Sequence, residues 1–222
     1  MSPTLEELYK KRHESVLLPL AQSLEKLLKE YFADVPRIDR VTTRAKSLQR
    51  FLQKAGKIEN EQKKYSDPLN QIQDQIGARI VTYYFDDVDP ISKVVETYFR
   101  PIELKTIVPD SESEFGYFGK HYILIIPDDL ITEDIEKSEA PCFFELQIKT
   151  LFQHAWGEAN HDLGYKAERQ LSSDEKRKIA FTSAQAWGAD MIFNELSRKA
   201  EEEKLHSSDV GAKDINTKTS SV

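Results

Sequence analysis

The chain alternates short runs of β-branched and aromatic residues with amphipathic helical patterns, and this alternation limits its fold more than any other feature. Runs rich in Val, Ile, Tyr and Phe predict buried strands at 78–85, 103–108, 121–126 and 142–148. A further extended stretch is expected at 38–43. Because helical patterns separate these runs, we expect an α+β (mixed α/β) fold, with a mixed β-sheet of about five strands covered by helices.

The helical patterns divide the chain further. Thr4 and Glu7 have the spacing of a capping box and open a long helix, which we expect to kink or break at Pro19 and to end near Pro36. Helices are also predicted at 44–54, with a basic face, at 91–98 and at 150–166. Ser172 and Glu175 form a second capping-box pattern that opens a final helix. The expected parts are an N-terminal helix at 1–37, a central domain at 38–170, a C-terminal helix packing on it at 171–200 and a disordered polar tail at 201–222.

Charge and cysteine content exclude several classes of protein. The 31 Lys and Arg against 38 Asp and Glu give a net charge of −7, which argues against a broadly basic nucleic-acid-binding protein. A single Cys, Cys142, forms no internal disulfide and no cysteine-based metal cluster, and we expect it to be buried. No long apolar run or leader pattern is visible, so we expect a cytoplasmic protein without a membrane partner.

Two acidic residues lie where a sheet would not usually place a charge. Asp74 comes just before the strand predicted at 78–85, and Glu145 lies inside an apolar run. Neighbouring strand ends could bring the two carboxylates together, and paired carboxylates are common ligands of Mg²⁺. The alternative is that Glu145 and Gln147 simply face solvent on one side of a strand.

Basic residues surround these carboxylates in the sequence. Arg44, Lys46 and Lys54 lie in the predicted basic helix, Arg79 starts the following strand, and Lys149 and Lys166 flank the helix at 150–166. In an acidic chain, such local positive charge favours a phosphate site. A solvated helical face is the alternative for any one of them. In the loop before the strand at 121–126, Tyr117 lies between two glycines and could stack on a base.

The helix at 150–166 carries His154, Glu158 and His161 on one stripe. The spacing of the two histidines differs from the i, i+4 pair of zinc-dependent proteases. The pair His161-Asp162 is found in metal phosphohydrolases, but the chain lacks the further His and Asp ligands that those sites need. Both metal interpretations are therefore rejected.

Five motifs occur in an order that resembles the synthetase domain of the RelA/SpoT family, over roughly residues 38–166. They are Arg44-x-Lys46-Ser47 with Lys54 downstream, Asp74-x-x-Gly77-x-Arg79-Ile80, Gly116-Tyr117-x-x-x-His121, Glu145-Leu-Gln-Ile-Lys-Thr150 and His161-Asp-Leu-Gly-Tyr-Lys166. The chain looks like a stand-alone small alarmone synthetase, because it has no room for the hydrolase and regulatory domains of long family members.

The resemblance implies a nucleotidyltransferase-like sheet and an enzyme, a GTP or GDP 3′-pyrophosphokinase. Such an enzyme transfers pyrophosphate from ATP to the 3′-hydroxyl of GDP or GTP to make (p)ppGpp, with release of AMP. By this resemblance Asp74 holds Mg²⁺, and Glu145 completes the metal site or takes the proton of the attacking hydroxyl. The residues implied for ATP are Arg44 and Arg79 at the adenine and Lys46 and Lys54 at the phosphates. Those implied for the acceptor are Tyr117, His121, Gln147, Lys149, His161, Tyr165 and Lys166.

The acceptor stays open at this point. The chain departs from the family pattern at Arg50, Gly119 and Gly164, and the acidic segment 110–114 precedes Tyr117. One alternative is a toxin-type member that pyrophosphorylates tRNA 3′ ends or adenosine nucleotides, with a cognate antitoxin as partner. A second is a catalytically inactive nucleotide-binding module. The oligomeric state also stays open at this point, and a homo-oligomer such as the tetramer common among relatives of this size is one alternative.

Overall fold

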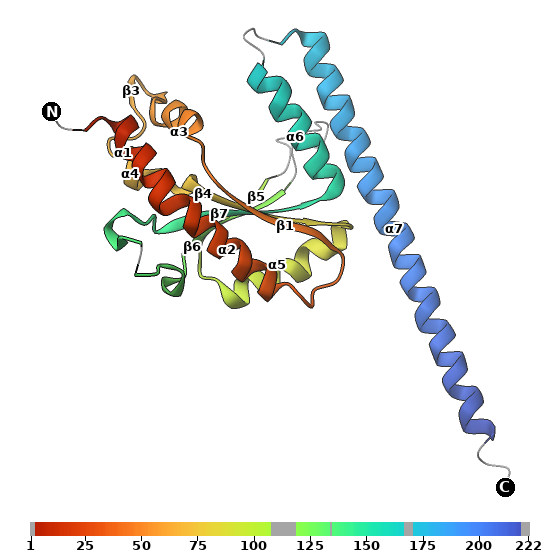
Figure 1. Ribbon diagram of the computed structural model, residues 1–222. Helices are drawn as coiled ribbons and strands as arrows, with labels where there is room; N and C mark the ends of the chain where they lie inside the picture. The colour runs from red at the N-terminus through yellow and green to blue at the C-terminus, as the bar shows by residue number, and fades with distance from the viewer. Residues whose placement is uncertain (1–2, 108–118, 134, 167–170, 219–222) are drawn as a thin grey trace.

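The computed structural model describes residues 3–107, 119–133, 135–166 and 171–218, with side chains at 107, 164–166 and 207–218 left aside. Its centre is a five-stranded sheet in the order β1-β4-β7-β6-β5 (Figure 1). The strands are β1 (Ile38–Ala45), β4 (Ile76–Thr82), β7 (Phe143–Thr150), β6 (Gly119–Ile125) and β5 (Pro101–Ile107). Only β4 and β7 pair in parallel within this sheet; its other pairs are antiparallel. The predicted mixed sheet is confirmed.

One face of the sheet is apolar and forms the core. Alternate residues of the central strands point to this face, among them Ile80, Leu146 and Leu124, all with no exposed surface. They join one cluster with the apolar side of α2 (Leu18–Tyr31) and with residues of α5 (Val88–Tyr98). Figure 1 shows both helices on the same side of the sheet. Full burial of each large apolar side chain contributes about 1.5–3 kcal/mol.

The N-terminal helix changes its winding just before its proline. α1 (Leu5–Arg12) begins with the predicted capping box, in which Thr4 and Glu7 satisfy each other's backbone N–H groups. A π-helical segment, η1 (His13–Leu17), then leads into α2 without a break. Because Pro19 has no N–H to donate, the wider π-turn absorbs the interruption that the sequence predicts there.

The predicted basic helix at 44–54 is wrong at its start. β1 extends through Ala45, so Arg44 lies on a strand, paired with Gly77 of β4. The helix α3 (Leu48–Ala55) begins only after Ser47, whose hydroxyl accepts from the N–H of Arg50. A serine N-cap stabilises a helix start by about 1 kcal/mol, and here it separates the two elements.

Several short elements connect the strands. The predicted loop at 57–70 contains a small hairpin of β2 (Ile58–Glu59) and β3 (Gln62–Lys63) and the turn α4 (Pro68–Gln71). A 3₁₀ turn, η2 (Gln73–Gln75), then carries Asp74 into β4. The remaining 3₁₀ turns are η3 (Phe85–Asp87), η4 (Asp128–Leu130) and η5 (Lys137–Glu139). Cys142 is exposed, which corrects the expectation of a buried thiol, because it lies outside β7.

Two helices lie on the other side of the sheet. α6 (Leu151–Lys166) follows β7 directly and packs along α7 (Ser173–Lys218), which begins with the predicted Ser172–Glu175 capping box (Figure 1). The expected end near residue 200 is not observed, because α7 continues through Lys218, and residues 219–222 of the tail expected to be disordered lie outside the described residues. Residues 201–205 are Glu, Glu, Glu, Lys and Leu, all strong helix formers, and they let α7 continue. None of the helices in the described part of the chain combines the length and apolar character needed to span a bilayer.

Candidate active site

The second face of the sheet is polar, and the strand register places most of the predicted site residues on it. Arg44, Gly77 and Glu145 lie side by side across β1, β4 and β7. The next row aligns Arg79 and Gln147 with His121 of β6. Residues paired in this way point to the same face. A small cavity of ≈ 60 Å³ lies on this face, bordered by Arg44, Arg79, Glu145 and Gln147.

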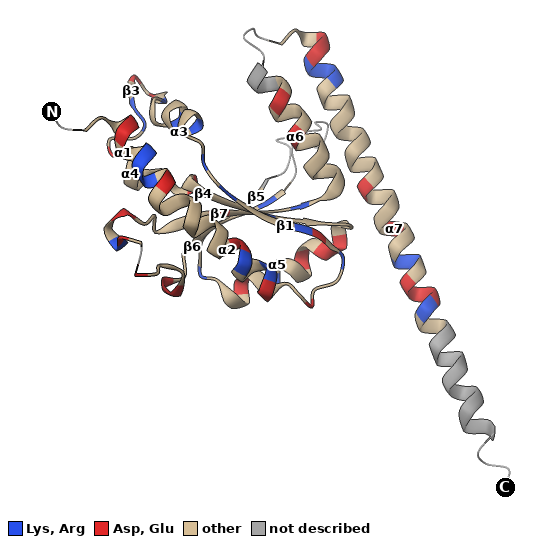
Figure 2. Cartoon of the chain, in the orientation of Figure 1, with Lys and Arg blue, Asp and Glu red and all other residues tan. Residues whose placement is uncertain are grey.

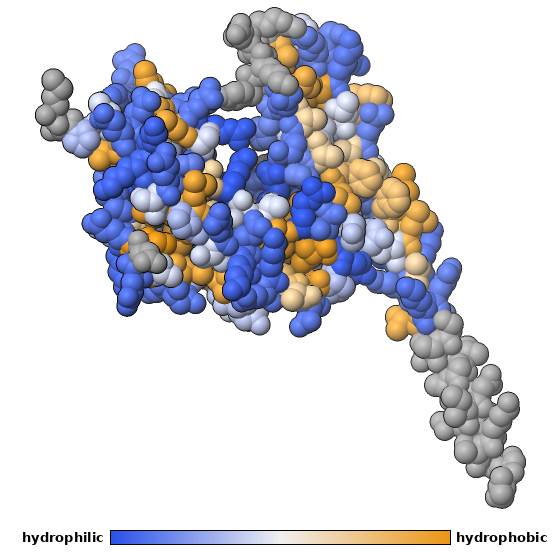
Figure 3. All heavy atoms as spheres, viewed as in Figure 1, coloured by the Kyte–Doolittle hydropathy of each residue, from blue (hydrophilic) through white to orange (hydrophobic). Residues whose placement is uncertain are grey.

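Helices α3 and α6 stand at two sides of this polar face. Figure 2 shows basic residues on α3 and on the segment that joins it to β1. Figure 3 shows a hollow between α3 and α6 whose visible walls are hydrophilic. Basic residues therefore gather beside the polar face, as the sequence predicts, although Figure 2 shows others on α1, α2 and α7.

Asp74 is held between two lysines. The Nζ of Lys46 lies 2.9 Å from Oδ2 and the Nζ of Lys54 lies 2.9 Å from Oδ1 of this carboxylate. Burial alone would raise the pKa of Asp74, but the charges and hydrogen bonds of Lys46 and then Lys54 outweigh it and hold that pKa below its usual value. Asp74 is therefore ionised at neutral pH, although its side chain is only 19% exposed.

Glu145 has a different partner. Its Oε1 lies 3.0 Å from Nδ1 of His121. Burial raises the pKa of Glu145, but the hydrogen bond and charge of His121, together with a hydrogen bond from Gln147, hold that pKa below its usual value. The negative charge of Asp74 also acts to raise the pKa of Glu145, which shows that the two carboxylates belong to one electrostatic site.

The donor chemistry of this site suits Mg²⁺. Both carboxylates are ionised oxygen ligands, and Mg²⁺ commonly takes one or two of these and completes its shell with water and phosphate. The described residues contain no group of three or more His, Cys, Asp or Glu side chains placed to hold a metal by themselves. A metal bound here would take its remaining ligands from water or from a bound ligand such as a phosphate. The Oε1 of Gln147, buried with no hydrogen-bond partner in the described part of the chain, adds an unused acceptor to the same face.

Arg79 is anchored by helix α6. Its Nη1 lies 2.8 Å from Oε1 of Glu158 and 3.1 Å from Nδ1 of His154. Burial raises the pKa of Glu158, but the charge and hydrogen bond of Arg79, together with the charges of His154 and Arg44, hold that pKa below its usual value. The pKa of His154 is lowered by burial first and by Arg79 second, so this ring is neutral at pH 7 and can accept. The i, i+4 spacing of His154 and Glu158 was the available signal for this anchor, yet sequence reasoning assigned neither residue to the site.

Lys149 is the most deeply buried cation of the polar face, with 2% of its surface exposed. Burial, followed by the charge of Arg79, lowers the pKa of Lys149 to about 7. The pKa of His161 on α6 is also lowered, by burial and then by Lys149. The two predicted acceptor residues are therefore electrostatically coupled, and both lose positive charge easily.

The structure thus gathers Arg44, Lys46, Lys54, Asp74, Arg79, His121, Glu145, Gln147, Lys149 and His161 around one polar face. Tyr117 lies outside the described residues, as do the side chains of Tyr165 and Lys166 in α6. Two further residues, Tyr9 and Arg12 of α1, reach the backbone beside Lys46 and Asp74. Sequence reasoning assigned both to the N-terminal helix alone.

Comparison with known proteins places this geometry in a family. Residues 43–170 match the model of the region found in RelA/SpoT proteins. The GTP pyrophosphokinase YjbM of Bacillus subtilis is 26% identical over 206 residues, which cover 86% of this chain and 92% of that protein. The structure is similar to that of small alarmone synthetase 1 from Bacillus subtilis, with a TM-score of 0.70, 25% identity and coverage of 85% of this chain and 97% of the other. The form of that synthetase bound to AMPCPP gives a TM-score of 0.60, with 25% identity and coverage of 86% and 99%. Because the family model spans more than half of its residues, the chain belongs to the RelA/SpoT family.

Proposed function

We propose that this chain transfers pyrophosphate from ATP to the 3′-hydroxyl of a guanosine nucleotide, GDP or GTP, and so makes (p)ppGpp and AMP. The observation that carries the proposal is the pair of ionised carboxylates, Asp74 in η2 and Glu145 on β7, among the lysines and arginines of the polar face. Phosphoryl-type transfer needs positioning and charge neutralisation more than covalent help, and these groups supply both. The names of the similar Bacillus subtilis proteins support the same activity.

On the donor side, Lys46 and Lys54 first bind Asp74 and then the phosphates of ATP. Without nucleotide both lysines neutralise Asp74. Their flexible stems allow them to turn to the ATP phosphates, and this frees Asp74 to hold Mg²⁺ with those phosphates. When bound, Mg²⁺ would offset the negative charge that develops on the transferred group. Arg44 and Arg79 then lie beside the adenine, and Glu158 fixes the guanidinium of Arg79 in place. The bound AMPCPP of the relative supports ATP as the donor.

On the acceptor side, Glu145 takes the proton of the ribose 3′-hydroxyl. The hydroxyl oxygen forms a bond to the β-phosphorus of ATP, while the bond from that phosphorus to the α,β-bridging oxygen breaks. AMP leaves with the bonding electron pair. His121 keeps Glu145 ionised before the transfer, as its effect on the pKa of Glu145 requires. Gln147, Lys149, His161, Tyr165, Lys166 and Tyr117 are proposed to line the acceptor.

The test is incubation of the purified chain with γ-labelled ATP, Mg²⁺ and, separately, GDP, GTP, ADP and deacylated tRNA. The expected result is label in a product of GDP or GTP together with stoichiometric AMP. Label in ADP or tRNA alone would replace the guanosine acceptor by the toxin-type alternative. A chain that binds ATP and labels no acceptor would be an inactive nucleotide-binding module.

A further inference from the structure

Two buried polar residues of α1 donate hydrogen bonds to backbone carbonyl groups near the donor site. Tyr9 and Arg12 lie one helical turn apart, with 0% and 5% of their surface exposed. They precede the segment 43–170 that matches the family model. We infer that Tyr9 and Arg12 are positioning residues that fix the two backbone segments carrying Lys46 and Asp74 in the geometry that binds ATP with Mg²⁺. This inference rests on the proposed function of the donor side.

Tyr9 holds the Lys46 side of the site. Its hydroxyl donates to the backbone carbonyl of Lys46 over 2.7 Å. Its ring stacks on that of Phe51 in α3, with the centroids 3.6 Å apart and the planes within 6°. Because Lys54 lies in the last turn of α3, one residue of α1 contacts the elements that carry both lysines of the Asp74 cluster.

Arg12 holds the Asp74 side. Its Nη1 donates to the carbonyl of Leu69 over 2.7 Å and to Oε1 of Gln75 over 3.4 Å. The amide of Gln75 in turn donates to the carbonyls of Leu69, at 2.8 Å, and Ile72, at 3.0 Å. The turn from 69 to 75 is thereby closed around the guanidinium, and Asp74 lies within it.

The two segments are also joined directly. The backbone N–H of Lys46 donates to the carbonyl of Gln75 over 2.8 Å. Three hydrogen bonds thus link Tyr9 through Lys46 and Gln75 to Arg12, and the backbone of α1 joins the two ends of this chain. A displacement of α1 at either residue changes the separation between Asp74 and its lysines. An ordinary packing helix would stabilise the fold through residues such as Leu17 and Leu20, without polar contacts that end at the site.

The experiment separates positioning from folding. Tyr9→Phe removes the bond to the Lys46 carbonyl and keeps the ring stack, Arg12→Met removes the guanidinium, and Arg12→Lys keeps one donor for the Leu69 carbonyl. Lys10→Met, an exposed cation on the same helix, is the matched control. Calorimetry measures binding of AMPCPP with Mg²⁺, initial rates give the KM of ATP and of the acceptor, and circular dichroism gives the unfolding temperature.

Tyr9→Phe and Arg12→Met are each expected to weaken binding of AMPCPP with Mg²⁺ about 10-fold, the scale seen when an outer group that orients a metal ligand is lost. The acceptor KM stays unchanged, Arg12→Lys recovers part of the loss, and Lys10→Met behaves as wild type. Tyr9→Phe keeps the test valid if Arg12→Met fails to fold.

Unchanged AMPCPP binding in a folded Tyr9→Phe variant and a folded Arg12→Met variant would overturn the inference. Equal weakening of donor and acceptor together with a lowered unfolding temperature would also overturn it, since that outcome describes a folding role. A wild-type chain that binds AMPCPP but transfers no pyrophosphate would defeat the proposed function alone. A wild-type chain that binds no AMPCPP would defeat both.

Discussion

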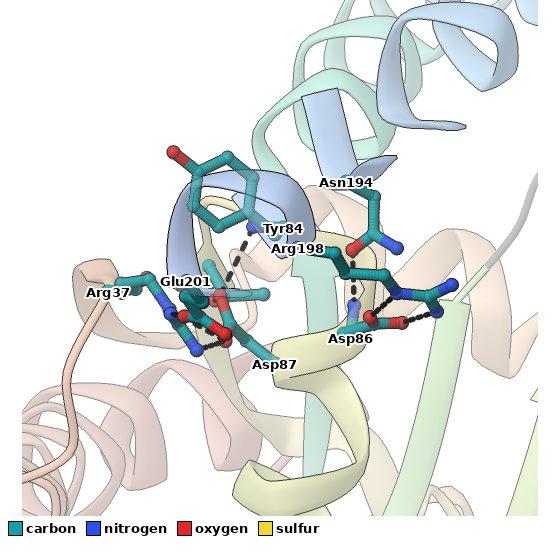
Figure 4. A network of polar contacts seen from close by, with 8 residues as sticks. Arg37, Tyr84, Asp86, Asp87, Asn194, Arg198 and Glu201 are labelled. Atoms are coloured by element: carbon teal, nitrogen blue, oxygen red, sulfur yellow. Dashed lines mark hydrogen bonds and ion pairs between the residues drawn. The ribbon is translucent and has the colours of Figure 1, made fainter. Parts of the chain in front are cut away.

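Two acidic clusters in this protein are both held by basic residues, yet only one of them is built to exchange partners. In the first, Asp74 meets Lys46 and Lys54 on the polar face of the sheet. In the second, Asp86 of η3 pairs with Arg198 in the middle of α7, and Asp87 pairs with Arg37 just before β1 (Figure 4). The two clusters differ in what else the carboxylates bind.

The second cluster is tied down by additional contacts. The guanidinium of Arg198 in α7 donates to both carboxylate oxygens of Asp86. The backbone N–H of Asp86 donates to the side-chain oxygen of Asn194 over 2.9 Å. Arg37 donates to Asp87, which also accepts from the hydroxyl of Thr82 and the N–H of Tyr84, both at 3.3 Å. Figure 4 shows these groups converging from η3, α7 and the start of β1. Bidentate guanidinium contacts together with backbone hydrogen bonds hold the carboxylates of Asp86 and Asp87 in a single orientation.

The Asp74 cluster has none of this redundancy among the described residues. Its partners are two ammonium groups, which act as point charges on flexible stems. The comparison teaches that counting acid–base pairs does not locate a site. A carboxylate paired only with flexible lysines, beside the polar face of the sheet, marks the place where a ligand can replace one of the partners.

The largest expected effect comes from Asp74→Asn. Because the amide cannot hold Mg²⁺ as a carboxylate does, transfer should fall by at least about 100-fold, the scale of a lost electrostatic contact in a transition state. The unfolding temperature should fall only moderately, since the favourable lysine contacts of Asp74 are weakened while both ammonium groups can turn toward solvent on their flexible stems. Steady-state rates and circular dichroism measure the two effects. Near-normal turnover of Asp74→Asn would show that the Asp74 cluster is not needed for transfer, and the contrast between the two clusters would then fail.

Asp87→Asn should behave in the opposite way. This change weakens a buried network that holds Arg37, so it is expected to lower the free energy of unfolding by about 1–3 kcal/mol. The KM of ATP should not change. Urea unfolding and initial rates are the measurements. A variant that loses ATP binding at full stability would show that the second cluster is also part of the site.

Lys54→Met should give a smaller effect. It removes one charge from Asp74 and one phosphate contact from the proposed donor site, so the KM of ATP should rise about 10-fold, or about 1.4 kcal/mol. The acceptor KM should be unaffected. Lys57→Met is a suitable control, because Lys57 is an exposed cation just after α3. Equal effects of both variants would indicate general attraction of the nucleotide instead of a specific contact.

The smallest expected effect concerns Asp190, a buried acid of α7 whose contacts among the described residues include no cation. The hydroxyl of Thr150 donates to its Oδ2 over 2.7 Å, and burial raises the pKa of Asp190 to about 6. Since the folded pKa exceeds the unfolded one, the stabilising contribution is present below about pH 4 and is lost as the pH rises through 6.

Asp190→Asn should therefore differ least from wild type below about pH 4 and should unfold at a higher temperature than wild type at pH 8. Thermal unfolding across this range measures the difference. Asp174→Asn, a change of an exposed acid on the same helix, should show no such pH dependence. A wild-type curve parallel to that of Asp190→Asn would show that the pKa of Asp190 does not differ between the folded and the unfolded chain.

Much of the fold was predictable because its strands are apolar runs with clear limits. The prediction at 121–126 differs from β6 by a residue or two at each end. The assignment of Arg44 to a helix was wrong because its basic neighbours continue the helical pattern, and only the cap at Ser47 reveals the boundary. The end of α7 was missed because a charged tail is typical of both an exposed helix and a disordered segment.

The site was predictable where it rests on side chains with their own chemistry, such as Asp74, Glu145 and Arg79. It was not predictable where a side chain acts on the backbone. The partners of Tyr9 and Arg12 are carbonyl groups of Lys46 and Leu69, and every residue has a carbonyl. No residue type marks such a partner in the sequence, so only the three-dimensional arrangement identifies it.

The parallel pairing of β4 with β7 also has a consequence for how the chain is made. Gly77 of β4 lies beside Glu145 of β7, and the intervening segment must be synthesised before these strands can meet. Closing so long a loop is entropically costly and slow. Asp74, just before β4, and Glu145 of β7 therefore come together only late in folding. A nascent chain that has emerged only as far as β6 carries Asp74 and its lysines but cannot yet perform the transfer.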